Sequence, residues 1–355
     1  MTIDLGAVKP GYLLSVFVIL LGLLMSGCAA KVRVNMLEPA SYHEASLAKT
    51  VAVLPFHGPG GREFASEFES VLAGIGIDDK PYFTLVDRAS IDKILSEMKL
   101  SQSGLVDEST AAKLGHLIGA QGIYTGVVTQ NASMDSPFRE WRQTCVQYEE
   151  RRDRQGRIFQ GRCLRWRQYQ VGCVRRAAVF SVSPRLVDVE TGRVLYSRNL
   201  TAQAESAGCE DTRPVENGLS LLARAKESVK AEFRRDIAPY YVTREIRLMD
   251  DADGIEAAEA KDKLKRGMDY AQNGRLDAAC ELWGQARILA PGSYALLYNL
   301  GVCAESRGDL DAALSLYRQA DNRLGKPHDD ITLALTRVGD AIRNREKLRE
   351  QLDSR

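Results

Sequence analysis

The sequence predicts an α/β (α+β) domain with a central sheet, followed by an all-α domain of helical repeats. Two observations predict this fold class. Short apolar runs typical of buried strands alternate with helical periodicities over residues 50–248, and similar segments recur every 34 residues from residue 260. With 355 residues, of which 45% are hydrophobic, the chain is long enough to bury two separate cores.

The N-terminal segment has the composition of an export signal. Residues 10–27 are predominantly apolar, follow Lys9, and are too few to span a bilayer comfortably. The sequence LMSGC, which ends at Cys28, resembles the lipobox of bacterial lipoproteins. This resemblance implies cleavage before Cys28, acylation of that residue, and retention at the outer membrane because Ala29, and not Asp, follows. The alternative is an ordinary signal peptide or a membrane anchor that contains a cysteine.

Composition and periodicity divide the chain into successive segments. The acidic stretch MDDADGIEAAEA (249–260) is interpreted as an interdomain linker and not as a calcium loop, because Met249 and Ala260 would occupy the first and twelfth ligand positions. The expected segments are a signal peptide (1–27), a tether (28–49), an α/β domain (50–248) with an inserted arginine-rich ribbon (138–176), a linker (249–259), two helical repeats (260–327), and a capping helix or tail (328–355).

Within the α/β domain, strand and helix signals alternate. A long amphipathic helix follows the strands, with Leu222, Ala225, Val229, Phe233 and Ile237 facing inward and Pro239 ending it. Such an order is typical of a sheet covered by helices. The earlier strands are expected at 51–56, at 82–86 and from Gly122, and the earlier helices at 64–72, at 91–98 and from Asp107 or Ser109 to Gly119.

The clearest strand pairing is a hairpin that turns at Gly192. Its three-residue loop places glycine where a positive φ is needed, and pairs residues whose numbers sum to 382. Leu186 then lies opposite Tyr196. Farther from the turn, Cys173 lies opposite Cys209, so we expect a disulfide between these two cysteines unless a bulge shifts the register.

The α/β segment resembles the CsgG-type curli-secretion lipoprotein family. The resemblance runs from VAVLPF through LVDRASIDKILSEMKLSQSGLVDESTAAKLGHLIGAQGIYTGVV to PRLVDVETGRVLYS and covers roughly half of the chain. The strand, the DR helix, the DESTAAKLG helix and the TG hairpin occur in the family's order. The same core recurs in relatives that form no pore, including lipoproteins that activate envelope enzymes. The resemblance therefore indicates the fold more specifically than the function.

The C-terminal repeats resemble tetratricopeptide repeats. NGRLDAACELWGQA, from Asn273, aligns with RGDLDAALSLYRQA, from Arg307, and Gly267 recurs as Gly301. These glycines let paired helices approach closely, and an aromatic side chain fills the space below. The family pattern implies a concave groove lined by Leu264, Met268, Tyr298 and Val302. The alternative is that these four residues belong to a packed core within the repeats.

The inserted ribbon, residues 138–176, holds eleven arginines, no lysine and four acidic residues. In channels of the resembled family, inserted hairpins span the membrane. Neither face of the second arm is apolar enough here, and an arginine near the bilayer midplane would cost roughly 2–4 kcal/mol. We therefore expect a ribbon in the periplasm, with a turn at Asp153-Arg154 that lets Cys145 face Cys163.

Arginine, more than lysine, suits bidentate contacts with carboxylate or phosphate, and tryptophan rings can stack on guanidinium groups. We therefore interpret the ribbon as a dock for an anionic partner. The alternative is a solvated hairpin whose arginines are used in internal cation–π pairs. The residues proposed for the dock are Trp141, Arg142, Arg165, Trp166 and Arg167.

Six of the seven cysteines remain once Cys28 is assigned to the lipid anchor, which is an even number in a compartment that permits disulfides. We expect Cys280 and Cys303 to be buried packing residues and not a third bridge.

The sequence contains no recognisable catalytic or metal-binding motif. The four histidines have no metal-ligand spacing, FHGPGG (56–61) lacks the ending of a phosphate loop, and no nucleophile elbow occurs. We therefore expect no catalysis, no metal and no cofactor.

The sequence thus predicts a lipoprotein on the periplasmic face of the outer membrane, acting as a non-catalytic scaffold for envelope secretion or surface-structure biogenesis such as curli assembly. Its expected partners are periplasmic or outer-membrane proteins, further copies of the chain, the membrane through its anchor, and peptidoglycan or another anionic envelope component. Export and a net charge of +1 argue against nucleic acid. The alternatives are an oligomeric CsgG-like secretion channel and an activator of a periplasmic cell-wall enzyme.

Overall fold

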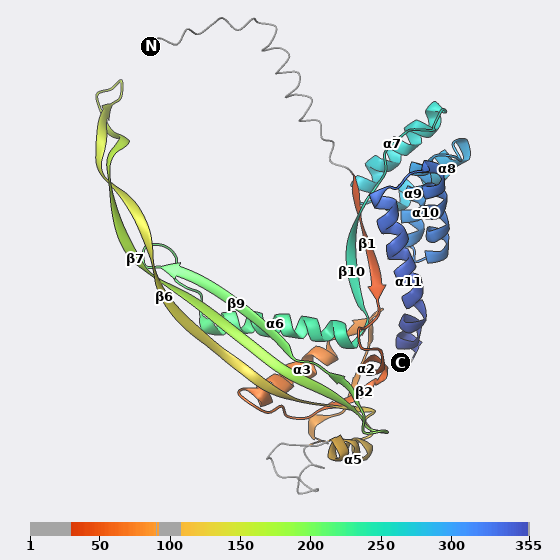
Figure 1. Ribbon diagram of the computed structural model, residues 1–355, viewed down its shortest axis with the longest axis horizontal. Coiled ribbons are helices and arrows are strands. Elements are labelled where there is room, and N and C mark those ends of the chain that lie inside the picture. Colours follow the sequence, from red (N-terminus) through yellow and green to blue (C-terminus); the bar gives the residue numbers. More distant parts are fainter. Residues whose placement is uncertain (1–29, 90, 92–107, 354–355) are drawn as a thin grey trace, which may run out of the picture. The chain divides into compact units, whose positions relative to one another are not determined.

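The computed structural model describes residues 30–89, 91 and 108–353 (Figure 1). The chain forms two compact units. The sheet unit comprises Glu38–Tyr240 and Glu346–Arg355, and the helical unit comprises the chain up to Leu37 together with Tyr241–Arg345. A mixed sheet in the first and successive helices in the second confirm the predicted fold class.

A six-stranded mixed sheet forms the centre of the sheet unit. Its order is β5-β2-β6-β7-β8, and β9 also pairs with β7. β2 runs parallel to β5 and β6, whereas the other pairs are antiparallel. The strands are β2 (Thr50–Val53), β5 (Thr84–Leu85), β6 (Gly122–Arg152), β7 (Ile158–Asp188), β8 (Val194–Ser197) and β9 (Leu200–Cys209), and a separate small hairpin joins β3 (Gly76–Ile77) to β4 (Lys80–Pro81).

Helices cover both faces of this sheet, as the neighbouring residues Ile123 and Tyr124 show. The Tyr124 ring packs against Phe68 and Phe233 at 5.2 and 5.7 Å between ring centroids, on the face covered by α3 and α6. Ile123 lies in a separate buried cluster with Leu114 of α5. Because successive strand residues point to opposite faces, the core has two layers. The helices are α3 (Gly61–Ala73), α5 (Glu108–Ile118) and α6 (Gly218–Ile237).

Most of the expected local elements are present where the structure describes the chain. In α6 the buried position is Leu221, and not the expected Leu222, whereas Ala225, Val229 and Phe233 are buried as expected. The helix expected over 91–98 lies outside the described residues except for Ile91, which is buried.

The predicted hairpin register is confirmed. Leu186 pairs with Tyr196, Cys173 pairs with Cys209, and Gly192 has a φ of 69°. The register shifts between Leu186 and Val187, close to the turn, so the pairing farther out is unaffected.

β6 and β7 are the longest strands, with 31 residues each. β9 ends opposite Cys173. Beyond that point β6 and β7 continue to their turn as a two-stranded ribbon (Figure 1). We call residues 139–172 the distal ribbon.

The segment expected to be a tether is folded where it is described. Residues Lys31–Glu38 form β1, which pairs with β10 (Tyr240–Arg247), and His43–Leu47 form the short helix α2. Val32 and Val34 are 5% and 2% exposed, so the strand has one buried face. The tether expectation therefore does not hold for these residues, because alternating valines provide a face that packing can bury.

In the helical unit, small glycines allow close helix pairing, as predicted. A Cβ built on Gly267 would lie 2.2 Å from Nε1 of Trp283, and one on Gly301 would lie 2.5 Å from Cε1 of Tyr317. Only glycine leaves room for these rings. The helices are α7 (Ala258–Gln272), α8 (Leu276–Leu289), α9 (Tyr294–Ser306), α10 (Leu310–Leu324) and α11 (Asp329–Asp353).

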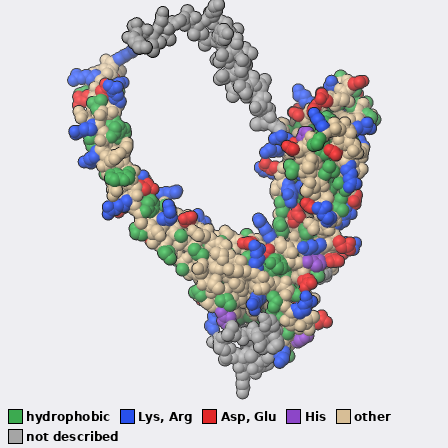
Figure 2. Space-filling view, viewed as in Figure 1, with side chains coloured by type: hydrophobic (Ala, Val, Ile, Leu, Met, Phe, Trp, Pro, Cys, Tyr) green, Lys and Arg blue, Asp and Glu red, His purple; other side chains and the backbone are tan. Residues whose placement is uncertain are grey.

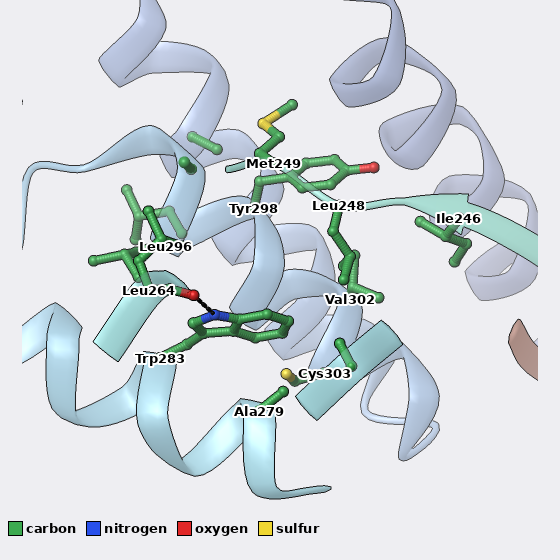
Figure 3. Packing of buried hydrophobic residues seen from close by; sticks show 14 of the residues in the cluster. Ile246, Leu248, Met249, Leu264, Ala279, Trp283, Leu296, Tyr298, Val302 and Cys303 are labelled. Carbon is green, nitrogen blue, oxygen red and sulfur yellow. Dashed lines mark hydrogen bonds between the residues drawn. The ribbon is translucent and has the colours of Figure 1, made fainter. Parts of the chain in front are cut away.

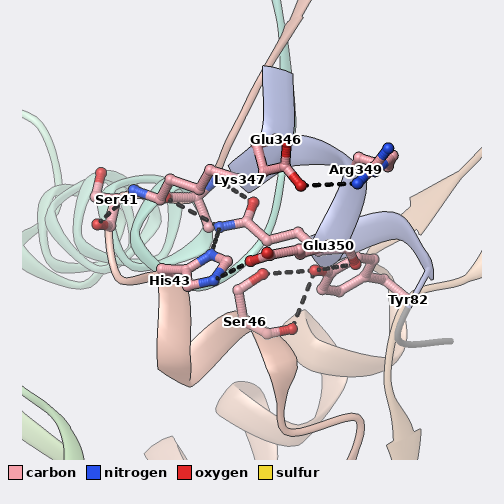
Figure 4. A network of polar contacts seen from close by, with 10 residues as sticks. Ser41, His43, Ser46, Tyr82, Glu346, Lys347, Arg349 and Glu350 are labelled. Atoms are coloured by element: carbon pink, nitrogen blue, oxygen red, sulfur yellow. Dashed lines mark hydrogen bonds and ion pairs between the residues drawn. The ribbon is translucent and has the colours of Figure 1, made fainter. Parts of the chain in front are cut away.

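The last residues of α11 belong to the sheet unit and form a buried polar network there (Figure 4). The Gln351 side chain accepts a hydrogen bond from the Ala40 amide at 2.9 Å, and the Gln351 carbonyl accepts one from Lys49 Nζ at 2.9 Å. Nearby, His43 and Glu350 approach to 2.9 Å. These contacts attach the C-terminal end of the chain to the start of the sheet unit.

Candidate partner-binding surfaces

Beyond its base, where Val171 is buried, the distal ribbon exposes both of its faces, because no third strand pairs with it among the residues that the structure describes. Basic side chains occur along its whole length (Figure 2). Large apolar side chains are exposed between them. The five most exposed of these are Trp141, Ile158, Phe159, Leu164 and Trp166, each between 49% and 65% accessible. Basic and apolar groups therefore alternate on one solvent-facing ribbon.

Arg142 is not a free anion-binding group. Its guanidinium pairs with Glu140 at 2.5 Å and with Asp211 at 3.1 Å. The hydrogen bonds to Glu140 and then to Asp211 raise the pKa of Arg142 above its ordinary value. Asp211 lies two residues after Cys209, the last residue of β9, so Arg142 fastens the base of the ribbon. The expectation that Arg142 belongs to the dock for an anionic partner is therefore wrong, because two carboxylates of the chain already neutralise it.

The guanidinium groups of Arg165 and Arg167 remain available for contacts with an anionic partner. Both are exposed, and neither side chain makes an ion pair or hydrogen bond with any residue that the structure describes. The same holds for Arg152 and Arg154 near the turn. Trp141 also lacks a guanidinium partner among the described residues, since the cation–π contact in this region joins Arg175 to Phe138. The arginine and aromatic side chains that contact one another near the base are thus different from those that the ribbon exposes to solvent.

Two disulfides hold the ribbon. Cys173 bonds Cys209 at its base, and Cys145 bonds Cys163 farther out, the two pairs that the sequence predicts. The second pair forms across irregular strands: the register places Cys145 opposite Trp166, with shifts on either side. The turn lies slightly later than expected, because the Gly156 amide donates to the Asp153 carbonyl at 3.0 Å.

A third disulfide joins Cys280 of α8 to Cys303 of α9. The expectation that these two cysteines are unpaired packing residues is therefore wrong. Helix spacing did not reveal their contact, because the two residues lie in different repeats. The even number of cysteines was the signal that could have indicated it.

The four residues expected to line an open repeat groove are buried in a core. Leu264, Met268, Tyr298 and Val302 are 0–5% exposed. Leu248, which directly follows β10, belongs to the same buried cluster (Figure 3). The expected groove is therefore not open. The strand and loop before the repeats place their own apolar side chains against these four residues, where a peptide ligand was expected to bind. The alternating pattern of residues 31–36 and 242–248 was the available signal.

Metal-binding chemistry gains no support from the described residues. One group, Glu140 with Cys173 and Cys209, brings ligand atoms within 4.8 Å of one another. Its two sulfur atoms are joined in a disulfide, so they offer no thiolate. Cys28, the expected lipidation site, lies outside the described residues.

Residues 77–135 match the family of the curli production assembly/transport component CsgG. Residues 264–326 match the tetratricopeptide repeat family. Both resemblances are confirmed, in the expected order. The CsgG match ends at Asp135, so the distal ribbon lies outside it. No curated protein matches the chain.

Several solved structures share weak similarity with the chain. Lipoprotein GNA1162 from Neisseria meningitidis is 13% identical, with a TM-score of 0.28, over 52% of this chain and 97% of its own. The C-terminal domain of LpoB from Salmonella enterica is 14% identical, with a TM-score of 0.25, over 52% and 90%. A PelC dodecamer from Paraburkholderia phytofirmans is 14% identical, with a TM-score of 0.23, over 59% and 99%. Among the described residues, no helix has the length and apolarity needed to cross a membrane.

Proposed function

We propose that this protein is a lipoprotein anchored at the outer membrane and facing the periplasm, where it acts as a non-catalytic scaffold for envelope secretion or surface-structure biogenesis. Lipidated Cys28 provides the anchor. Three disulfides among the described residues support an oxidising compartment. The CsgG match supports a role in assembly or transport.

The observation that carries this proposal is the distal ribbon. A two-stranded hairpin is only marginally stable by itself, and this one leaves Trp166 and its neighbours Arg165 and Arg167 in solvent. Aromatic and arginine side chains are the residue types that contribute most at binding interfaces. The ribbon is therefore the contact surface, and the sheet unit positions it.

The test is site-specific photo-crosslinking of the full chain in its native envelope. A crosslinker replaces Trp166, and a control crosslinker replaces exposed Arg318 of α10. We expect discrete protein adducts from position 166 that disappear in the R165E/R167E background, together with loss of the assembled surface structure. Unchanged adducts in that variant, or no adduct at all, would show that the ribbon is not the scaffold's contact surface.

A ring-shaped secretion channel is the second candidate, and the specific observation in its favour is the match to a CsgG assembly/transport component. It requires several copies of the chain to assemble. Electron microscopy of the full chain extracted in mild detergent separates the two functions. Rings with a central opening would favour the channel, and single small particles would favour the scaffold.

A further inference from the structure

The tip of the distal ribbon exposes apolar side chains on both of its faces. Ile158 and Phe159 are consecutive residues of β7, so their side chains point to opposite sides of the ribbon. They are 58% and 49% exposed. A protein partner that covered one face would leave the other residue in water. An environment that surrounds the tip would bury both.

Each of these apolar residues has an arginine directly opposite. The register pairs Ile158 with Arg152 and Phe159 with Arg151. Directly opposed residues share a face, so each face of the tip carries one apolar and one cationic side chain. Arg151 also pairs with Glu149 at 3.1 Å, whereas Arg152 and the turn residue Arg154 have no side-chain partner in the part of the chain that is described.

We propose that this tip, residues 151–159, docks on an anionic lipid surface. Ile158 and Phe159 enter the boundary between headgroups and acyl chains, and the guanidinium groups contact lipid phosphates. The inference rests on the proposed scaffold function and names one partner of the same ribbon. A bilayer interface surrounds the ribbon end on all sides, which the distribution of Ile158 and Phe159 requires.

The docking is interfacial and does not span the bilayer. Trp166 follows Phe159 by seven residues along β7, which corresponds to roughly 23 Å at about 3.3 Å per residue. Interfacial elements enter a membrane by about 5–10 Å. Trp166 and its neighbours Arg165 and Arg167 therefore stay outside the acyl region, where arginine is costly.

The test uses the full chain, purified in mild detergent and reconstituted into vesicles of phosphatidylcholine with or without phosphatidylglycerol. The reporter is F159W in a W141F/W166F background, in which Trp283, fully buried in the helical unit, gives a constant background. Lipids brominated near the headgroup quench the reporter. We expect quenching only in vesicles that contain phosphatidylglycerol. Adding R152Q/R154Q should lower the ratio of docked to free tips roughly 25-fold, about fivefold per arginine.

The matched control is R318Q/R323Q, which removes the same charge from exposed positions of α10 and should leave quenching unchanged. Equal quenching in neutral and anionic vesicles, or none in either, would refute the proposal. In a W141F chain, where Trp166 is the exposed tryptophan of the ribbon, its quenching by lipids brominated near the bilayer centre would show a spanning ribbon and would also refute the proposal.

Failure of the lipid proposal can be told apart from failure of the scaffold function. If the reporter is not quenched but the crosslinker at position 166 still yields discrete protein adducts, the ribbon binds a protein and the scaffold function stands. If the reporter is quenched but the crosslinker at position 166 yields no protein adducts, the ribbon binds the membrane and no protein, and the proposed scaffold function is wrong.

Discussion

Asn299 holds the backbone of Met249 with two hydrogen bonds inside the helical unit. Its side-chain oxygen accepts from the Met249 amide at 2.9 Å, and its side-chain nitrogen donates to the Met249 carbonyl at 2.7 Å. Asn299 is fully buried. This contact fastens the loop after β10 to α9, next to the residues once expected to form an open groove.

Replacing Asn299 by leucine should destabilise the helical unit, because both backbone groups of Met249 lose their buried partners. We expect a loss of about 2–5 kcal/mol in the free energy of unfolding. The measurement is urea unfolding followed by the fluorescence of Trp283 in a W141F/W166F background. Asn322→Leu, at an exposed position of α10, is the control and should change stability little. Equal effects of the two substitutions would contradict the structure.

Gly267→Ala should destabilise the first repeat, because the added Cβ would collide with the Trp283 ring. The cost of such overpacking is about 1–3 kcal/mol. Gly284→Ala is the matched control in α8, where nothing lies within 4 Å of the new Cβ. That change should stabilise the helix by about 0.5–1 kcal/mol. Thermal unfolding followed by circular dichroism would reveal the opposite signs, and a shared sign would rule out this packing.

Arg337→Met should be strongly destabilising. Arg337 pairs with Glu305 at 2.5 and 2.7 Å, and the Glu305 side chain is completely buried. Without the arginine, the Glu305 carboxylate keeps, among the described residues, the hydrogen bond from the Tyr317 hydroxyl at 2.6 Å. Losing one partner of a buried pair costs about 3–5 kcal/mol.

Arg345→Met provides the comparison for that substitution. Arg345 pairs with Asp311 on the surface, where an ion pair contributes about 0–1 kcal/mol. Urea unfolding of both variants should therefore give clearly different midpoints. Similar midpoints would mean that Glu305 is accessible to water.

Asp251 makes the helical unit sensitive to acid. Its pKa lies below the ordinary value, mainly because the Tyr294 hydroxyl donates a hydrogen bond to the carboxylate, with a further bond from the Asp253 amide. The stabilisation is present above the unfolded-state pKa of about 3.9 and is lost as the pH falls through the lower folded-state pKa.

Asp251→Asn should therefore lower the Tm at neutral pH and abolish part of its fall between about pH 4 and pH 2. The difference in Tm between the variant and the wild type should shrink as the pH decreases through this interval. A constant difference at every pH would show that the charge on Asp251 contributes nothing.

Local signals were sufficient for several features. The glycine at position 192 and the alternation around it determined the pairing of Cys173 with Cys209, because a tight turn leaves a hairpin one register. The repeat spacing indicated that Gly267 and Trp283 meet, since the same small and aromatic residues recur in the second repeat.

Other features depend on contacts between distant segments. The core around Leu264 includes Val32, more than two hundred residues earlier, and no local periodicity indicates which segment covers a helix pair. The bond between Cys280 and Cys303 likewise depends on how two repeats stack. For Arg142, the sequence showed a cation in an arginine-rich segment, but not that Glu140 and Asp211 neutralise it.

The sequence by itself determined the fold class, the order of the two domains, the repeat packing around Gly267 and the disulfide between Cys173 and Cys209, because each follows from short-range periodicity or turn geometry. Only the tertiary structure decided that the repeat groove is filled from within the chain. It also decided that Arg142 is paired, whereas Arg152 and Arg165 have no side-chain partner among the described residues. Those outcomes depend on which distant side chains come together, and burial and charge pairing are settled only when the whole chain has packed.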